Sequence, residues 1–219
     1  MELFAQWVVL LFHLDDQQDE GPMGRSPDQV RAVYQALTCV IDDDPTTLSA
    51  AAVAALTDLW PRAAAGLSDA WRGRFRAHLL RHRDAFLAQS AHRDRATVPT
   101  PQEYPALRRD ANGMFMFDLV EAALRAEVPA ALADGALWQE MYAASNDLTA
   151  WCNDVLSLNR EVAAGEVTNY VIVLERATGC GTTAALDRVL GRIRDRYLRL
   201  TSIRTELDRP LAALPSKKT

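Results

Sequence analysis

The sequence predicts an all-α protein, and two observations support that fold class. Helical signals follow one another through most of the 219 residues, and no stretch alternates apolar with polar residues as a β-strand does. The breaks between these segments are short, and the clearest is Val98-Pro99-Thr100-Pro101. Because there is neither a repeat nor a flexible linker, we expect residues 1–219 to form a single helical domain.

Signals at helix ends place the individual elements. Glu2 opens an apolar run that indicates a buried helix, which ends at Gly21-Pro22. Ser26-Pro27-Asp28-Gln29 combines an N-cap, a first-turn proline and a reciprocal capping partner, so it opens a helix that reaches about Thr38. A turn follows at Asp42-Asp43-Asp44-Pro45. The remaining helices are expected from about Leu48 with an interruption near Trp60-Pro61, from Ser68 to Arg95, from Gln102 to Glu127 with a pause at Asn112-Gly113, from Gly135 to Ala164, from Thr168 to Ala177 and from Thr182 to Leu207.

Length and composition are typical of a soluble globular chain. The residues are 49% hydrophobic and 24% charged, and the formal net charge is −5. An acidic balance argues against a nucleic-acid partner, and the arginines of residues 72–83 recur at the spacing of a solvated helix face. The three cysteines show no metal-like pairing, which favours a reduced, cytoplasmic compartment.

The apolar N-terminal segment predicts a core helix rather than a targeting signal. Met1 to Leu14 lacks a basic region at its start and runs directly into acidic residues. It is also too short to span a bilayer, so we expect no membrane partner.

Four acidic residues gather at the end of the first predicted helix: Asp15, Asp16, Asp19 and Glu20, here named the aspartate cluster. On a helix, residues three or four apart share a face, so Asp15 and Asp16 would each lie beside Asp19. The negative end of the helix dipole disfavours acids at this place. Taken alone, the cluster predicts either a ligand site or simply an acidic helix end.

A second set of oxygen donors lies in the helix predicted over residues 135–164. Asn153, Ser157 and Glu161, here named the Asn/Ser/Glu station, follow one another at intervals of four residues. This spacing places their side chains within an arc of about 80° along roughly 12 Å of helix. Amide, hydroxyl and carboxylate oxygens are hard ligands that suit Mg²⁺, which shares its coordination shell with substrate phosphates. Together the two sets predict a magnesium-diphosphate site.

The order, spacing and helical context of these segments resemble the class I terpene synthases (terpene cyclases) of bacterial type. Leu14 to Glu20 is similar to the aspartate-rich motif of that family, and Asn153 to Glu161 is similar to its Asn/Ser/Glu motif. Gly165 to Val171 looks like the usual continuation of the second motif. Arg108-Arg109-Asp110-x-x-Gly113 is similar to the segment that holds a diphosphate-sensing arginine, its linker residue and a helix-break glycine.

The resemblance implies a helical bundle around a central cavity and an enzyme of isoprenoid secondary metabolism. Such a cyclase ionises an allylic isoprenyl diphosphate, here farnesyl diphosphate before geranyl diphosphate, and cyclises the carbocation to a sesquiterpene. It implies a cofactor of roughly three Mg²⁺ ions bound together with the substrate diphosphate. The implied roles are metal binding for Asp15, Asp16, Asp19, Asn153, Ser157 and Glu161, diphosphate binding for Arg109 and Arg160, and linker and helix break for Asp110 and Gly113.

Three further residues are candidates for the substrate pocket. Aromatic faces stabilise cations without reacting with them. Phe12 stands one helical turn before the aspartate cluster, and ordinary core packing is its alternative role. Phe115 and Met116 follow the predicted break at Asn112-Gly113.

We expect the chain to be shortened at both ends relative to that family. Only 14 residues precede Asp15, where the family has several helices. Arg196-Tyr197 follows Glu161 too closely to be the family's C-terminal Arg-Tyr pair, so that role is not carried over to it. Dimerisation over the exposed helices is one way in which the protein would compensate.

Three alternatives stay open at this point. An isoprenyl diphosphate chain-elongating synthase would have a second aspartate-rich motif in place of the Asn/Ser/Glu station, which disfavours it. A catalytically impaired or shortened terpenoid-fold protein would bind Mg²⁺ and diphosphate without completing the reaction. A helical interaction module with incidental acids leaves the spacing of the two oxygen-donor sets unexplained.

Overall fold

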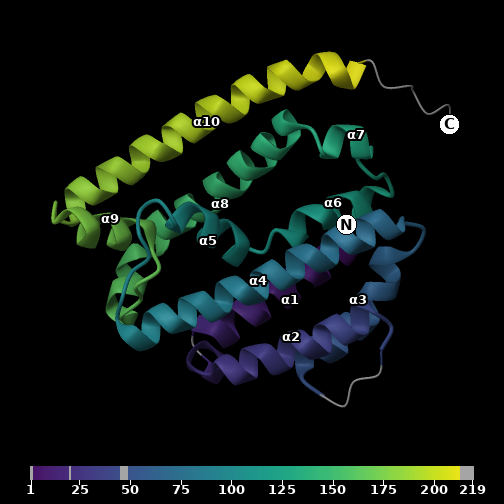
Figure 1. Cartoon of the computed structure of the whole chain (residues 1–219), viewed down its shortest axis with the longest axis horizontal. Helices are drawn as coiled ribbons and strands as arrows, with labels where there is room; N and C mark the ends of the chain where they lie inside the picture. The colour runs from purple at the N-terminus through teal and green to yellow at the C-terminus, as the bar shows by residue number, and fades with distance from the viewer. Residues whose placement is uncertain (1, 20, 45–48, 213–219) are drawn as a thin grey trace. The chain divides into compact units, whose positions relative to one another are not determined.

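The computed structural model describes residues 2–19, 21–44 and 49–212, without the side chains of residues 22, 25 and 208–212. Every regular element in these ranges is a helix (Figure 1), which confirms the predicted all-α class. No helix in the described ranges is both long and apolar enough to cross a bilayer. The elements in chain order are α1 (Glu2–Asp19), η1 (Pro22–Arg25), α2 (Pro27–Ile41), α3 (Ala51–Ala64), α4 (Asp69–Arg95), α5 (Tyr104–Ala111), α6 (Phe115–Leu124), α7 (Ala130–Ala133), α8 (Ala136–Ala164), α9 (Tyr170–Thr178) and α10 (Thr182–Ala212).

Several predicted helix ends are observed. Ser26 caps α2, because its Oγ accepts a hydrogen bond from the Gln29 backbone N–H at 3.4 Å. The pause expected at Asn112-Gly113 separates α5 from α6. The helix expected from about Leu48 begins at Ala51, and Leu48 itself lies outside the described residues, as does Pro45 of the predicted turn.

The predicted interruption at Trp60-Pro61 is wrong, because α3 continues through Pro61 to Ala64. A proline inside a helix removes one backbone hydrogen bond and costs about 3 kcal/mol. Trp60 is 2% exposed and stacks on Trp71 with ring centroids 5.8 Å apart. Burial of a tryptophan contributes about 3–5 kcal/mol, so this packing offsets the cost of the proline.

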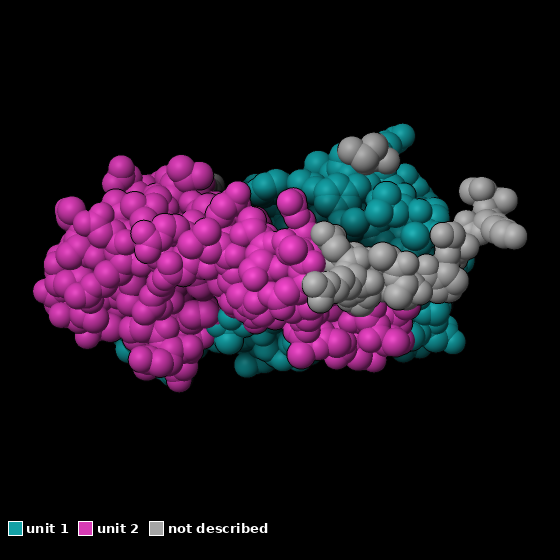
Figure 2. Space-filling view, turned by 90° about the horizontal axis from the view of Figure 1, so that it is seen from above, with its two compact units in different colours: residues 1–99, 106–127 teal, residues 100–105, 128–219 magenta. Residues whose placement is uncertain are grey.

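The chain divides into two compact units, which Figure 2 colours separately. Unit 1 comprises residues 1–99 and 106–127, and unit 2 comprises residues 100–105 and 128–219. The aspartate cluster belongs to unit 1 and the Asn/Ser/Glu station to unit 2. The single domain over residues 1–219 stays a prediction.

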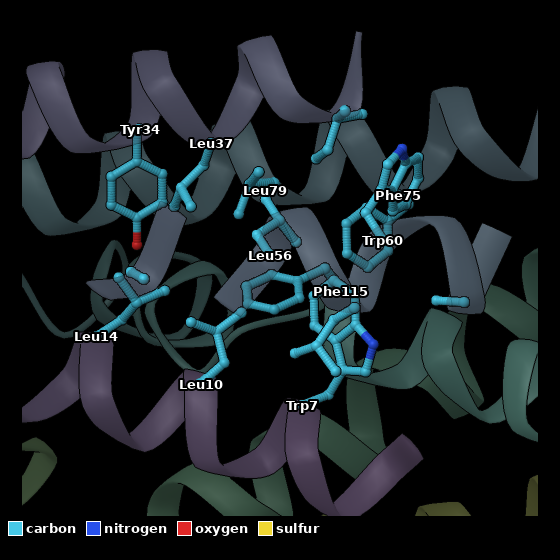
Figure 3. Close-up of a cluster of buried hydrophobic side chains, with 14 of the residues drawn as sticks. Trp7, Leu10, Leu14, Tyr34, Leu37, Leu56, Trp60, Phe75, Leu79 and Phe115 are labelled. Atoms are coloured by element: carbon cyan, nitrogen blue, oxygen red, sulfur yellow. The ribbon is translucent and has the colours of Figure 1, made fainter. Parts of the chain in front are cut away.

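Aromatic rings from four helices form the centre of the core of unit 1 (Figure 3). The ring centroid of Phe75 in α4 lies 5.1 Å from Trp60 of α3, 5.4 Å from Trp7 of α1 and 5.5 Å from Phe115 of α6. Aromatic pairs at these separations add about 0.5–1.5 kcal/mol each to the gain from burial. These aromatic contacts therefore hold α1 against α4. The last turns of α1 contain the aspartate cluster.

A buried histidine links three helices of unit 1. His82 of α4 has its Nδ1 2.6 Å from the hydroxyl of Tyr34 in α2 and its Nε2 3.1 Å from the carbonyl oxygen of Ala111, the last residue of α5. A carbonyl oxygen only accepts, so Nε2 donates to Ala111 and Nδ1 accepts from the Tyr34 hydroxyl. Burial lowers the pKa of His82 to about 3, against the opposing effect of the Ala111 hydrogen bond, so the ring is neutral at neutral pH.

An ion-pair network fixes α6 against α4. Asp118 of α6 is 1% exposed, accepts from Arg74 Nε at 3.0 Å and lies 2.5 Å from His78 Nδ1. Arg74 also donates to Glu121, and Trp71 Nε1 donates to the Asp118 carbonyl oxygen at 3.1 Å. A buried carboxylate needs such partners, so the network determines where α6, and the chain that leads into it, can lie.

Unit 2 is built on α8 and α10. Arg196 of α10 donates to the buried carboxylate of Asp147 at 2.7 Å and to Glu140, both on α8. Arg192 lies over the ring of Tyr170 in α9, with its guanidinium carbon 5.0 Å from the ring centroid. Arg196 thus joins α10 to α8.

We predict that His82 makes the protein less stable as the pH falls from about 6.5 towards 3. Below pH 6.5 the unfolded chain binds a proton at this imidazole that the folded state does not bind, so acid favours unfolding by up to about 1.4 kcal/mol per pH unit. Urea unfolding of the wild type and of His82→Gln measures this effect at two pH values on either side of the ordinary pKa.

Glutamine keeps a hydrogen-bonding side chain but does not titrate. Between roughly pH 7.5 and pH 5.5, the free energy of unfolding of His82→Gln should therefore fall by about 1 kcal/mol less than that of the wild type. An equal pH dependence in the two proteins would contradict the assignment of a neutral His82.

Candidate functional site

The aspartate cluster lies in the last turns of α1. Asp15 is half-buried, Asp16 and Asp19 are exposed, and Glu20 lies outside the described residues. Gln18, which lies between Asp16 and Asp19 in the sequence, is fully buried. Its Nε2 donates to the carbonyl oxygen of Phe86 at 3.1 Å and to Ser90 Oγ at 3.3 Å, both on α4. The end of α1 is therefore anchored by the amide between the acids, which leaves the acidic side chains towards the surface.

Arg93 of α4 contacts the end of α1 in two places. Its Nη2 lies 2.7 Å from Asp19 Oδ1, and its Nη1 donates to the carbonyl oxygen of Gln18 at 3.3 Å. A cation at a helix C-terminus offsets the negative end of the dipole. Asp19 thus has a cationic partner on α4, and its role as a metal ligand stays a prediction.

The chain after α1 passes very close to the helix end. A Cβ at Gly24 would lie 1.8 Å from the carbonyl oxygen of Gln18, so no other residue fits there without a shift of the backbone. Ser90 Oγ donates to the Gly24 carbonyl oxygen at 2.9 Å. The last turn of α1, η1 and α4 are therefore locked together around Gln18.

The break between α5 and α6 lies against the helix of the aspartate cluster. Gly113 has φ +73°, a conformation that favours glycine, and a Cβ there would lie 3.0 Å from Leu11 Cδ1. Leu11 stands one helical turn before Asp15 on α1. Both the backbone conformation and the close approach explain why the helix breaks at a glycine.

The predicted diphosphate-sensing segment occupies the last turn of α5. Arg108, Arg109 and Asp110 are half-buried. Burial raises the pKa of Asp110, while the positive charges of Arg81, His78 and Arg109 oppose that rise. Asp110 therefore interacts electrostatically with Arg109, and its Oδ1 also lies 3.8 Å from Nε of Arg81 on α4. The sensor and linker roles stay predictions.

The pocket candidates differ in exposure. Phe12 on α1 is 61% exposed, one turn before Asp16. Phe115 is 1% exposed and packs against Phe75 and against His82, whose ring centroid lies 5.3 Å away. Its ring therefore belongs to the aromatic core, and Met116 is buried beside it. Of these candidates only Phe12 offers an open aromatic face, and the pocket roles stay predictions.

A cavity of about 290 Å³ lies on another side of α1. It is lined by His13 and Gln17 of α1, by Gln29 of α2 and by apolar residues around them, and none of Asp15, Asp16 and Asp19 is among its described lining residues. We therefore do not assign it to the candidate metal site.

The Asn/Ser/Glu station forms one side of α8. Asn153 is exposed, Ser157 is 9% exposed and Glu161 is half-buried. Ser157 Oγ donates its proton to the Asn153 carbonyl oxygen at 2.7 Å, so the lone pairs of the hydroxyl stay available to a cation. Arg160, the predicted diphosphate ligand, is exposed on the same helix.

The segment after α8 folds back onto the station. Asn169, fully buried, donates from Nδ2 to Glu161 Oε2 at 2.8 Å and to the Asp154 carbonyl oxygen at 2.7 Å. Asp154 is also buried, and its Oδ2 accepts from the Tyr104 hydroxyl at 2.6 Å and from the Tyr170 backbone N–H at 3.2 Å. The carboxylate of Glu161 is thus held by a buried amide rather than left to move in solvent.

The donor types of the station fit a hard divalent cation. An amide oxygen, a hydroxyl and a carboxylate on one helix face are oxygen ligands of the kind that Mg²⁺ accepts. Among the described residues, no group of at least three His, Cys, Asp and Glu side chains is arranged to hold a metal by itself. The three oxygen donors of the station would leave coordination positions for a bound phosphate or for water, which suits Mg²⁺.

Sequence reasoning did not predict the structural parts played by Asn169, Asp154 and His82. A polar residue directly before the apolar run of α9 is an N-cap signal, and it could have drawn attention to Asn169. No local pattern pairs His82 with Ala111, 29 residues away, or with Tyr34, 48 residues away.

Comparisons with known proteins agree with the motifs. The model of terpene synthase family 2, C-terminal metal binding, matches residues 6–199. The (+)-T-muurolol synthase ((2E,6E)-farnesyl diphosphate cyclizing) of Roseiflexus castenholzii is 31% identical over 192 residues, which are 87% of this chain and 59% of that protein. The (−)-delta-cadinene synthase of Streptomyces clavuligerus is 32% identical over 216 residues, which are 98% of this chain and 65% of that protein.

The fold agrees as well. The crystal structure of germacradien-4-ol synthase from Streptomyces citricolor matches with a TM-score of 0.84 at 26% identity, over 98% of this chain and 69% of that one. The chain spans 59% and 65% of the length of the two curated relatives named above. Because the family model covers the aspartate cluster, the α5–α6 break and the Asn/Ser/Glu station together, the chain belongs to terpene synthase family 2, in the part that the model describes as the C-terminal metal-binding region.

Proposed function

We propose that the protein is a terpene cyclase that ionises an allylic isoprenyl diphosphate, with farnesyl diphosphate favoured, and cyclises the carbocation to a sesquiterpene. The observation that supports this most is the oxygen-donor side of α8, on which a buried amide holds Glu161. A relative whose name specifies farnesyl diphosphate cyclisation supports the choice of substrate.

The residues of the station fit Mg²⁺ as the cofactor. The proposed metal ligands are Asn153, Ser157 and Glu161 on α8 of unit 2 and Asp15, Asp16 and Asp19 on α1 of unit 1. Bound Mg²⁺ would neutralise negative charge on the leaving diphosphate.

The remaining chemistry falls to side chains of this chain. When the allylic C–O bond breaks, the electron pair stays on the diphosphate oxygen, and Arg109 and Arg160 donate hydrogen bonds to that growing charge. The carbocation then closes onto a double bond of the same isoprenyl chain and loses a proton to the released diphosphate. The exposed face of Phe12 would stabilise the cation without reacting with it.

Chain elongation is the less favoured reaction. An elongating synthase would present a second aspartate-rich motif, whereas α8 presents an amide, a hydroxyl and a carboxylate at its corresponding positions. A protein that binds Mg²⁺ and diphosphate without turnover is the second alternative, and the first experiment separates it from the cyclase.

That experiment incubates the protein with Mg²⁺ and geranyl, farnesyl or geranylgeranyl diphosphate, followed by product analysis. A cyclic hydrocarbon or alcohol formed from farnesyl diphosphate supports the proposal. Thermal stabilisation by Mg²⁺ and pyrophosphate without any product indicates the binding protein instead. A longer diphosphate formed after addition of isopentenyl diphosphate indicates elongation.

We predict that turnover requires a divalent cation and that Asn153→Ala and Glu161→Ala each lose activity at limiting Mg²⁺ by at least about tenfold, because each removes a metal ligand. Steady-state rates as a function of Mg²⁺ concentration measure the loss. Asn159→Ala, an exposed change on the same helix, is the control and should behave as the wild type. Near-normal rates of either ligand variant at limiting Mg²⁺ would show that the metal assignment is wrong.

We also predict that Arg109→Lys impairs turnover more than Arg108→Lys does. Lysine keeps the charge but loses the planar fork that binds two phosphate oxygens together, so kcat/KM should fall by about tenfold or more at a diphosphate contact. The two arginines are neighbours on α5 and are both half-buried, which makes each the matched control for the other. Equal sensitivity, or greater sensitivity at Arg108, would show that the register is wrong.

A further inference from the structure

We infer that Asn169 is a positioning residue for Glu161, and thus that the turn between α8 and α9 sets the affinity of the station for its metal. The inference rests on the proposed function, because it takes Glu161 as a metal ligand. It concerns a side chain that has no oxygen directed to the metal itself.

The hydrogen bonds fix the orientation of the Asn169 amide. Its Oδ1 accepts from the Val171 backbone N–H at 2.9 Å, which makes Asn169 the N-cap of α9. Its Nδ2 faces two acceptors, Glu161 Oε2 and the carbonyl oxygen of Asp154. If the amide oxygen and nitrogen were exchanged, Oδ1 would face the two acceptor oxygens and Nδ2 would face the Val171 N–H donor. Only the observed orientation therefore satisfies all three partners.

The turn that presents Asn169 is itself held firmly. Glu166 Oε1 accepts from the backbone N–H groups of Val167 and Thr168 at 2.7 and 2.8 Å and from the Thr168 hydroxyl at 2.6 Å. The buried carboxylate of Asp154 binds the Tyr170 N–H. Asn169 is therefore flanked on both sides by anchored backbone, and it cannot move away from α8 without the loss of several buried hydrogen bonds.

The consequence for Glu161 is preorganisation. One carboxylate oxygen, Oε2, is engaged by Asn169, which restricts the rotamers of a long side chain before any metal binds. Outer partners of this kind orient metal ligands and typically change metal affinity by about 10- to 100-fold when removed. Glu161 Oε1 is then the oxygen placed for the cation.

Asparagine meets three requirements that other residues do not meet together: it caps α9, it donates to Glu161 Oε2 and it donates to the Asp154 carbonyl oxygen. Aspartate would cap α9 equally well, but it would place a carboxylate against Glu161 Oε2. Serine would also cap, but its hydroxyl is too short to reach both the helix N-terminus and Glu161. The comparison suggests substitutions that keep the cap and remove the donor that Glu161 shares with the Asp154 carbonyl oxygen.

The experiment measures Mn²⁺ binding in the presence of inorganic pyrophosphate by electron paramagnetic resonance, with the 219-residue wild type, Asn169→Asp, Asn169→Ser and Asn159→Asp. Asn159 is exposed on α8 two residues before Glu161, so Asn159→Asp adds the same charge nearby without contact to the buried amide. We expect Asn169→Asp and Asn169→Ser to weaken Mn²⁺ binding by about tenfold or more, and Asn159→Asp to change it by less than about twofold.

A double-mutant cycle separates positioning from general structural damage. In a Glu161→Ala background, Asn169→Ser should weaken Mn²⁺ binding no further, because the side chain that it positions is already absent. A further tenfold loss in that background would overturn the positioning role, as would wild-type affinity in both Asn169 variants. If wild-type protein itself binds no Mn²⁺ with pyrophosphate, the proposed function fails together with this role.

Discussion

The backbone groups at helix ends must find hydrogen-bond partners, and in this protein buried polar side chains supply them beside the candidate ligands. Arg93 donates to the Gln18 carbonyl oxygen at the end of α1, and His82 donates to the Ala111 carbonyl oxygen at the end of α5. At the start of α9, Asp154 and Asn169 accept the N–H groups of Tyr170 and Val171. The same hydrogen bonds that satisfy the backbone thus place the residues proposed to bind the diphosphate and its metal.

Because of this constraint, the side chains that stabilise each segment differ from most of the side chains proposed to bind ligands. In each acidic segment a buried polar residue makes hydrogen bonds to neighbouring elements, as Gln18 does beside the acids of α1 and Asp154 does in the second motif. Most candidate ligands, such as Asp16 and Asn153, are exposed or half-buried neighbours, and Ser157, at 9% exposure, is the buried exception. Substitution of a buried member would disturb packing, whereas substitution of an exposed member changes mainly what the surface can bind.

Local signals in the sequence predicted much of the fold, but they did not predict the long-range contacts. Ser26 and the glycine break at Gly113 act through neighbouring residues, so their effects could be predicted. Pro61 was misjudged because its effect is overridden by the stacking of Trp60 on Trp71, a contact between two helices. The candidate ligand residues were proposed from motif resemblance. The hydrogen bond between Asn169 and Glu161 depends on how the turn folds back, which spacing alone does not specify.

At the end of α1, neighbouring charges distinguish the candidate metal ligands of the aspartate cluster. A helix C-terminus disfavours carboxylates, and Arg93 offsets that effect by its contacts with the Gln18 carbonyl oxygen and with Asp19. A cation that bound Asp19 would have to compete with this guanidinium, which is held by two partners. Asp15 lies one turn earlier on the half-buried side of α1, and its negative charge, after burial, helps to raise the pKa of Tyr34. The competition with Arg93 therefore argues against Asp19 as the principal metal ligand of the cluster, and that role stays a prediction for Asp15.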